Sequence, residues 1–448
     1  MKKCKVYFTI SKSFKNLLNV LYTFIIGIYT CKVYFTIMSE DNEWPIIQRE
    51  HYFKLILAGI DEPFIKIITG IRRCGKSTLM NLLHKELSNS GIQESDIVHL
   101  NFDIDDRDLP QDHRSLTDYI ESIINVGPKK YVLLDEIQNV KEWERTVSSL
   151  YAKGADVYIT GSNSQMLSSE LSTKLSGRCI ELNIMPLTFS EYLKFRFKSL
   201  SSKENLFLDF IKNGGLPAVA ISEDRGSKVL IPNIISETYQ TVYSKDVIDR
   251  HKIRDPAVLR NLIKFIMRNI GDRTSSRKAA NYLNSSGQKI SHVTLESYIE
   301  HLEDAMLISR AKRIDSKTKD YLVTSDKLYA TDLGIRNLIV PFRPEDIDGI
   351  LENVVYNELR YRFEEVAVCD VNGMEIDFVV NYSSKPEYFQ VCYSLNSQDV
   401  VEREIRPFRV IEDSYPKTVI TYERYLLNDI DGVRVVPILD WLTENNDS

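Results

Sequence analysis

The chain has 448 residues, a net charge of −6 and a hydrophobic fraction of 43%, which is an ordinary composition for a globular protein of two or three domains. Its six cysteines form no C-x-x-C pair and no cluster with histidines, which argues against a disulfide framework or a zinc site and indicates a reducing cytoplasm. Residues 1–38 contribute +6 from six lysines and no acid, which leaves −12 for the rest and excludes bulk attraction to nucleic acid.

The first 38 residues differ from the rest of the chain. The stretch 17–38 carries one charge, at Lys32, and follows five lysines, a pattern that fits a signal peptide or a membrane anchor. Against that interpretation, no A-x-A cleavage pattern follows, and the heptapeptide CKVYFTI occurs at both 4–10 and 31–37. Met38 then opens an ordinary polar start. We therefore expect a leader from a mis-called initiation codon rather than an anchor, and no membrane association.

A phosphate-binding loop is predicted directly after a strand at 64–69 and before a helix. Gly70, Gly75, Lys76 and Ser77 fit G-x-x-x-x-G-K-[ST]. The glycines let consecutive N–H groups point at a phosphate, and the helix start adds the positive end of its dipole. The lysine reaches the β- and γ-phosphates, and the serine hydroxyl holds Mg²⁺. The residues expected to bind ATP are Gly70, Ile71, Arg72, Arg73, Cys74, Gly75, Lys76, Ser77 and Thr78.

Strands and helices alternate after this loop. Strands are predicted at 96–102, 131–136 and 156–160, with helices at 116–124 and 143–152. Alternation of this kind builds a parallel sheet with right-handed crossovers, and ligands bind at the carboxyl ends of its strands. The expected fold class of this part is therefore α/β, with the parallel sheet of a P-loop NTPase.

Charged residues surround the expected phosphate site. Asp135 ends an apolar strand, where it could hold Mg²⁺ through water or Ser77, and the adjacent Glu136 could polarise a water toward the γ-phosphate. A strand that ends in two acids is often only a solvated edge, but here it lies downstream of a phosphate-binding loop. Arg72 and Arg73 within the loop could instead contact the surroundings of the nucleotide or a partner subunit.

Polar residues follow the next strand. Thr160, Ser162 or Asn163 could orient the attacking water or sense the γ-phosphate, unless the segment is a simple turn, and we favour Asn163. Arg178 precedes the expected last strand of the sheet. It could reach a γ-phosphate in its own or a neighbouring subunit, as arginine fingers do, or form an ordinary salt bridge. We therefore count Glu136, Asn163 and Arg178 as the candidate catalytic residues.

A series of motifs supports this interpretation and resembles the prokaryotic AAA-type ATPases that carry a C-terminal domain of unknown function. The motifs are GIRRCGKS at 70–77, LLDEIQ at 133–138, TGSNS at 160–164, SGR at 176–178, MPLTFSEY at 185–192 and GGLP at 214–217. The resemblance implies a P-loop core of the additional-strand type, then a winged-helix region and a restriction-endonuclease-like domain. The expected boundaries are 1–38 for the leader, 45–198 for the ATP-binding core, 199–254 for a helical lid or linker, 255–340 for the winged helix and 349–442 for the last domain.

The middle of the chain has the pattern of a winged helix-turn-helix, three helices followed by a β-hairpin. The predicted helices and strands are 206–212, 229–250, 258–269, 276–283, 293–306, 308–314 and 321–324. Positive residues gather on the expected wing and could contact phosphates: Arg310, Lys312, Arg313, Lys317 and Lys319. The candidate recognition helix is acidic, a poor surface for a major groove, because it carries Glu296, Glu300, Glu303 and Asp304. We favour a structural or partner-contact role over sequence reading.

A small C-terminal α/β domain is predicted from a helix at 351–360, strands at 366–371 and 374–380, and a strand at 388–393. Asn372-Gly373 between the first two strands favours a tight hairpin turn. These elements suit the last domain that the resemblance implies.

The resemblance also implies a metal-dependent nuclease site in that domain: a helix Glu, an Asp in Glu-x-Asp-Phe, and Glu-x-Lys on the next strand. Glu352, Glu358 and Asp377 remain, whereas Gln390 and Cys392 stand where the glutamate and lysine should be. Glutamine removes an anionic Mg²⁺ ligand, and cysteine supplies no ammonium. We therefore expect structural carboxylates here and no nuclease activity.

The sequence predicts an ATP-binding and ATP-hydrolysing protein, with ATP and Mg²⁺ as ligands, whose nucleotide state repositions the helical and C-terminal domains. Two alternatives stay open: an ATP-regulated metal-dependent nuclease, and a nucleotide-gated binding protein without hydrolysis. DNA at the winged helix, a protein partner and a second copy of the chain are the candidate partners.

Overall fold

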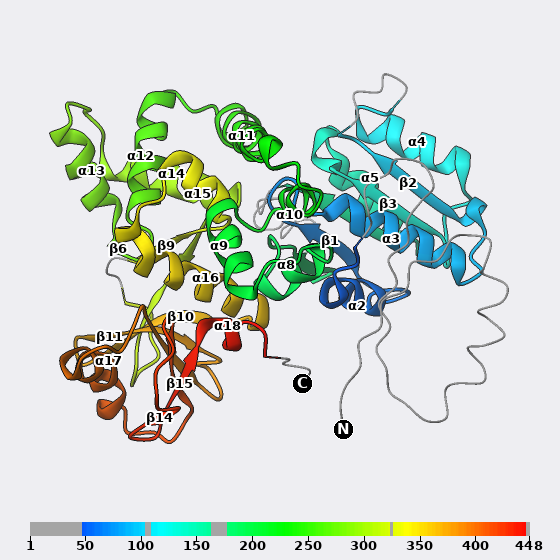
Figure 1. The fold of residues 1–448 in the computed structure, drawn as a ribbon. Coiled ribbons are helices and arrows are strands. Elements are labelled where there is room, and N and C mark those ends of the chain that lie inside the picture. The colour runs from blue at the N-terminus through cyan, green and yellow to red at the C-terminus, as the bar shows by residue number, and fades with distance from the viewer. Residues whose placement is uncertain (1–46, 104–108, 163–176, 323–325, 445–448) are drawn as a thin grey trace, which may run out of the picture. The chain divides into compact units, whose positions relative to one another are not determined.

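The computed structural model describes residues 47–103, 109–162, 177–322 and 326–444 (Figure 1). The expected leader at 1–38 and the candidate Asn163 lie outside the described residues. The residues from Glu50 onward belong to one structural unit. Within the described ranges, no helix is both long and apolar enough to cross a membrane.

The first sheet has five parallel strands in the order β2-β3-β4-β1-β5. Its central strands are buried on both faces, as their uninterrupted apolar runs require. This arrangement confirms the predicted P-loop type of α/β sheet. The strands are β1 (Ile65–Thr69), β2 (Ile97–Asn101), β3 (Tyr131–Asp135), β4 (Asp156–Gly161) and β5 (Cys179–Asn183).

Helices cover both faces of this sheet. On one face, alternate residues of the strands pack against α4 and α5 in a single apolar cluster, which includes Ile67, Ile120 and Val147. On the other face, the Tyr158 hydroxyl donates to the Ile56 carbonyl of α2. The helices are α2 (Glu50–Ala58), α3 (Lys76–Asn89), α4 (His113–Ile123) and α5 (Trp143–Ala152).

A helical region follows the sheet. Thr188 and Glu191 form a capping box that starts its first helix, and Pro217 occupies the first turn of α10, a helix that the sequence pattern did not predict. The last helix, α11, continues without a break into a π-helix, a form that is often found at functional sites. The bounds are α8 (Phe189–Phe195), α9 (Lys203–Asn213), α10 (Pro217–Asp224), α11 (Ile231–Thr241) and η5 (Val242–Asp249).

The next region combines four helices with an antiparallel sheet in the order β6-β9-β7. The predicted hairpin is present in part: Ile314 forms an antiparallel bridge with Tyr321, whereas 308–311 pairs with 326–330 instead of 321–324. The segment after it turns away because Ile314 is buried in the core of the C-terminal sheet. The elements are α12 (Pro256–Arg268), β6 (Arg273–Thr274), α13 (Ser276–Ser285), α14 (His292–Asp304), β7 (Ile308–Ala311), β9 (Asp326–Ala330) and α15 (Leu333–Ile339).

The C-terminal sheet is mixed and has seven strands, in the order β14-β15-β13-β12-β11-β10-β8. The predicted hairpin around Asn372-Gly373 is present, and both turn residues have positive φ. The elements are β8 (Arg313–Asp315), α16 (Ile347–Arg362), β10 (Val366–Val371), β11 (Met374–Val380), β12 (Glu387–Cys392), α17 (Gln398–Val410), β13 (Lys417–Thr421), β14 (Asp429–Ile430), β15 (Val433–Pro437) and α18 (Ile438–Trp441).

Candidate active site

The loop between β1 and α3 is tightly folded, and its two glycines are needed for different reasons. A Cβ on Gly70 would lie 2.3 Å from the Ile184 carbonyl oxygen, so any side chain would collide with the neighbouring backbone. Gly75 has φ +107 in open space, where a side chain would strain the backbone without a collision. Arg73 also has a positive φ, of 64°. The backbone therefore turns as a phosphate-binding loop requires.

Lys76 is the buried cation of this loop, with 4% of its surface exposed. Its ammonium lies 2.9 Å from the Gly70 carbonyl oxygen and 3.3 Å from Glu136 Oε1. Burial lowers the pKa of Lys76, but the neighbouring Cys74 and Glu136 outweigh burial and raise the pKa above its ordinary value. The lysine is thus a permanent cation whose present partners are oxygens that a phosphate could replace.

Asp135 ends β3 and is fully buried. The Thr160 hydroxyl donates to its Oδ1, while Oδ2 has no hydrogen-bond partner among the described residues. A buried carboxylate oxygen without a partner is costly, and a divalent cation or one of its waters would satisfy it. Ser77, the second residue of α3, is partly buried and supplies a hydroxyl. These oxygens fit Mg²⁺, which is bound by one or two protein ligands together with phosphates and water.

Glu136 follows Asp135 in an unusual conformation, because it has φ 52° although it is not a glycine. Its N–H donates to the Thr160 hydroxyl at 2.9 Å, and the Gln138 side-chain amide donates to its Oε2. Burial raises the pKa of Glu136, but the charge of Lys76 and the Gln138 hydrogen bond lower it below its ordinary value. Glu136 is therefore held as an ionised carboxylate beside the loop. Backbone strain of this type concentrates at functional sites.

Arg72 joins the loop to the π-helix, a contact that the sequence did not reveal. Its Nε donates to Asp246 Oδ2 at 2.7 Å, and the same carboxylate accepts from the Ser162 hydroxyl at 3.3 Å. Asp246 is buried and belongs to η5. One carboxylate of the helical region thus contacts both the phosphate-binding loop and the end of β4.

Two further arginines lie where the loop and the helical region approach each other. Arg73 donates to Glu237 Oε2 of α11 at 3.1 Å, so both loop arginines contact this helical run. Arg250 follows the π-helix and is partly buried. Burial lowers the pKa of Arg250, Asp246 opposes that effect, and Arg72 adds to it. Arg250 is therefore within electrostatic range of the loop, a position that sequence spacing alone could not indicate.

The remaining candidates of this core are placed less uniformly. Thr160 contacts Asp135 and Glu136, and Ser162 contacts the π-helix, whereas Asn163 is not described. Arg178 precedes β5, whose first residue pairs in parallel with Ile65 at the start of β1. Arg178 therefore lies at the N-terminal ends of the strands, whereas the loop follows the C-terminal end of β1, about 13 Å away along the strand. Its guanidinium lies over the Tyr151 ring. Any role for Arg178 in the site of its own chain is incompatible with this placement.

The C-terminal carboxylates surround an internal lysine. Lys327 Nζ lies 2.7 Å from Glu352, 2.8 Å from Glu375 and 3.1 Å from Asp377. Glu358 is elsewhere, paired with Arg362 at 2.7 Å. An ammonium therefore lies between Glu352 and Asp377, two of the three carboxylates that the resemblance assigns to a metal.

The residues that replace the expected glutamate and lysine are also engaged or buried. Gln390 accepts the Asp377 N–H at 3.2 Å and donates to Glu404 at 2.9 Å. Cys392 is buried, and burial raises the pKa of its thiol. Neither residue supplies an anionic ligand or a cation at this position.

The positive residues of the expected wing are partly neutralised. Arg310 forms ion pairs with Glu296 at 2.9 Å and Glu303 at 2.7 Å. Arg313 pairs with Asp370 at 2.6 Å on the C-terminal sheet. These two arginines stabilise the protein's own structure, so any contact of this region with phosphates would depend on its lysines.

Comparison with known proteins supports the assignment of the loop. A protein family described as "AAA domain" matches residues 62–193, and a "Domain of unknown function (DUF8612)" matches residues 204–346. An uncharacterized protein of Haemophilus influenzae is 32% identical over 403 residues, which cover 89% of this chain and 99% of that protein. The chain belongs to the same family as this protein, with a P-loop ATPase domain of the AAA type. The predicted AAA-type core is thereby confirmed at the level of the domain.

Another member of this AAA-type family and one solved structure are also similar. An uncharacterized protein of Methanocaldococcus jannaschii is 31% identical over 402 residues, which cover 84% of this chain and 88% of that protein. The structure of a Walker-type ATPase of Pyrococcus abyssi has a TM-score of 0.42 and 16% identity, over 65% of this chain and 95% of that chain. The AAA domain of this chain implies that it binds ATP, typically with Mg²⁺.

Proposed function

We propose that this chain binds ATP with Mg²⁺ at the loop 70–78 and hydrolyses it, and that the nucleotide state repositions the helical and C-terminal regions. The observation that carries the proposal is the buried Lys76–Glu136 pair beside the unpartnered Oδ2 of Asp135. If the ion pair were purely structural, the buried Asp135 oxygen beside it would cost free energy without a compensating ligand.

Each residue of this site has a proposed role. Lys76 exchanges its carbonyl and carboxylate partners for phosphate oxygens, which frees Glu136 to accept a proton from an attacking water. Asp135 and Ser77 would hold Mg²⁺, which supplies charge neutralisation on the phosphates. Thr160 keeps Asp135 and Glu136 in position, because it hydrogen-bonds to both.

The proposed route from the nucleotide to the rest of the protein is the Arg72–Asp246 pair. A bound γ-phosphate would compete with Asp246 for the guanidinium of Arg72, since both are anions. Release of Asp246 would free the π-helix from the loop and from Ser162. The helical region would then move. We propose that this movement acts on a protein partner or a second copy of the chain rather than on DNA. Arg178, if it acts as an arginine finger, would act in the second copy.

The two alternatives make different use of the same residues. A nuclease would need a metal among Glu352, Glu375 and Asp377, where Lys327 already supplies the positive charge. A nucleotide-gated binding protein without hydrolysis would need Lys76 and Mg²⁺ ligands but not Glu136. The positive φ of Glu136 and its place beside Lys76 favour hydrolysis over this second alternative, because backbone strain of this type concentrates at functional sites.

Measurements of phosphate release and ATP binding by Glu136→Gln distinguish ATP hydrolysis from nucleotide-gated binding. We expect Mg-ATP affinity close to that of the parent and turnover slower by about 10²–10⁴-fold, as for loss of a general base. The exposed Glu142→Gln, on the segment that leads into α5, is the matched control and should behave as the parent. Turnover by Glu136→Gln equal to that of the parent would contradict the proposed role, and absence of turnover in the parent would favour the binding protein.

A further inference from the structure

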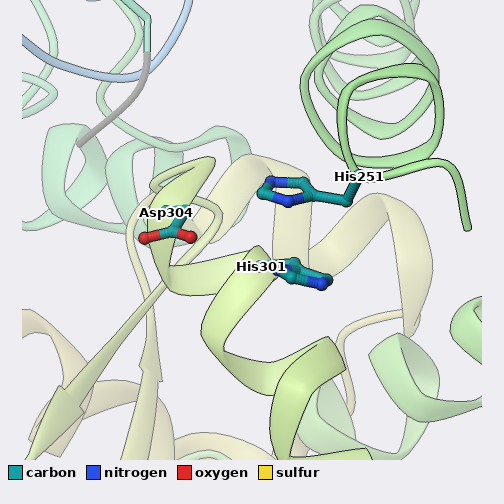
Figure 2. Close-up of side chains that lie close together, drawn as sticks. All are labelled: His251, His301 and Asp304. Carbon is teal, nitrogen blue, oxygen red and sulfur yellow. The ribbon is translucent and has the colours of Figure 1, made fainter. Parts of the chain in front are cut away.

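Two histidines and one aspartate lie together between the end of the π-helix run and α14, although the sequence shows no histidine motif. His251 belongs to the first element, and His301 and Asp304 belong to the second (Figure 2). One ligand atom from each residue lies within 4.8 Å of the other two. The two imidazole rings are stacked, with centroids 3.8 Å apart and planes 17° from parallel.

Ring nitrogens without partners point to a ligand. Nε2 of His251 and Nδ1 of His301 are buried and have no hydrogen-bond partner among the described residues. Nε2 of His301 lies 3.2 Å from the Ser297 hydroxyl. When Nε2 donates that hydrogen bond, Nδ1 carries the lone pair, which is how a second contact sets the tautomer of a metal-binding histidine.

Charged groups lie close to the two imidazole rings. Burial, His301 and Arg250 lower the pKa of His251 to about 4, and burial lowers the pKa of His301, while Asp304 opposes that effect. Metals bind the neutral imidazole through a nitrogen lone pair, so the ring nitrogens without hydrogen-bond partners are the candidate ligand atoms. Asp304 adds an anionic oxygen.

We propose that His251, His301 and Asp304 bind one divalent transition metal ion of the Zn²⁺ class. Two imidazole nitrogens and one carboxylate oxygen are a common ligand set for such ions and leave a fourth position for water. Donor atoms of a tetrahedral zinc site lie about 3.3 Å apart, given Zn–N distances of about 2.0–2.1 Å. On binding, the ligand atoms therefore approach one another by up to about 1.5 Å. Nearly parallel rings cannot direct in-plane lone pairs at one ion, so one ring must also rotate about its soft χ2 angle.

The position of the site gives the ion a structural consequence. His251 ends the helical run that carries Asp246, the partner of Arg72 in the phosphate-binding loop. His301 and Asp304 lie at the end of α14. A bound ion would tie these two segments together and restrict the movement of the helix that contacts the loop. This consequence is independent of whether ATP is hydrolysed.

The test is zinc binding by the full chain after removal of metals with a chelator. Titration against a competing chelator, with bound zinc counted by mass spectrometry, should give one ion per chain. Affinity should fall at least about 100-fold in His251→Gln and in His301→Gln, since loss of even an outer-shell partner costs about 10–100-fold. The exposed His292→Gln on the same helix is the matched control and should bind as the parent.

Several outcomes would overturn the proposal. They are absence of stoichiometric zinc in the parent, parent-like binding by both variants, or loss of zinc in His84→Gln, whose Nδ1 lies 3.3 Å from that of His99. Circular dichroism of the zinc-free proteins checks folding, and Asp304→Asn, which keeps the side-chain shape, decides the matter if a histidine variant misfolds. Zinc should raise the unfolding temperature of the parent and of His292→Gln but not of the site variants.

Discussion

Two buried lysines, Lys76 and Lys327, are 4% and 3% exposed and have very different surroundings. Lys76 contacts one carboxylate and the carbonyl oxygen of Gly70 on a glycine-rich loop. Lys327 contacts three carboxylates from β11 and α16, one of which also accepts from Tyr329. The first ammonium has partners that a ligand can replace, and the second has its charge fully satisfied by the protein.

The difference shows why similar residue types support different functions. A cation in a loop beside an unpartnered carboxylate oxygen can exchange its contacts for phosphate oxygens and Mg²⁺. Lys327 occupies the position among three carboxylates that a divalent ion would need, and Arg273 also pairs with Glu375. The C-terminal acids therefore stabilise the junction of β9, β11 and α16, whereas the acids beside the loop remain available for chemistry.

The largest expected effect is on stability. Lys327→Met removes the ammonium shared by the buried Asp377 and the partly buried Glu352 and Glu375, and Glu375 keeps Arg273 as a partner. The loss of this cation should lower the free energy of unfolding by about 3–5 kcal/mol. Urea unfolding measures this loss. Lys317→Met, at an exposed position, is the matched control and should change stability little. A Lys327→Met protein as stable as the parent would show that the charges are not buried together.

The same variant should have a steeper pH dependence than the parent. Burial raises the pKa of Glu352, and Lys327 partly offsets that effect. Without Lys327, the folded state keeps protons that the unfolded state releases near its ordinary pKa of about 4. The free energy of unfolding of Lys327→Met should therefore fall from about pH 5 to about pH 8, more than that of the parent. A parallel course of the two curves would contradict the assigned charge cluster.

A smaller effect is expected where the loop meets the π-helix. Asp246→Asn weakens the pair with Arg72 and removes a negative charge near the phosphates, so ATP affinity should rise by up to about tenfold, or 1.4 kcal/mol. Calorimetry with Mg-ATP measures the change. Asp249→Asn, an exposed position on the same helix, is the control. Weaker binding in Asp246→Asn would mean that this residue supports the nucleotide instead of competing with it.

No DNA cleavage is expected. The purified protein should not cleave single- or double-stranded DNA with Mg²⁺ or Mn²⁺, with or without ATP, because Lys327 occupies the centre of the acidic cluster. Asp377→Ala should then change stability and no cleavage activity. Cleavage by the parent that disappears in Asp377→Ala would establish the nuclease alternative.

Much of the parallel sheet could be predicted from the sequence, because its signals are local. The apolar run of β3 ends at the predicted acids, and α5 has the predicted bounds. The glycine spacing placed Lys76 and Ser77 at the start of α3. These features depend on strand periodicity and on turn chemistry within a few residues.

Features that depend on distant contacts could not be predicted. Arg72 and Asp246 are 174 residues apart in the sequence. Lys327 and Asp377 belong to two different sheets and meet only because these sheets pack together. The predicted hairpin is correct at the bridge between Ile314 and Tyr321, but Ile308–Ala311 pairs farther along the chain, because the burial of Ile314 with the C-terminal core diverts the chain. Which end of the strands Arg178 occupies became clear only from the register of β5 against β1.

The most direct test compares Mg-ATP binding by Lys76→Met and Lys327→Met under conditions in which both proteins are folded. Each variant removes one buried ammonium and keeps a side chain of similar length. We predict that Lys76→Met loses about 10–100-fold in affinity, the value of charge-assisted hydrogen bonds to phosphate, and that Lys327→Met binds as the parent. Parent-like binding by Lys76→Met, or loss of binding in Lys327→Met, would contradict the assignment of the nucleotide site.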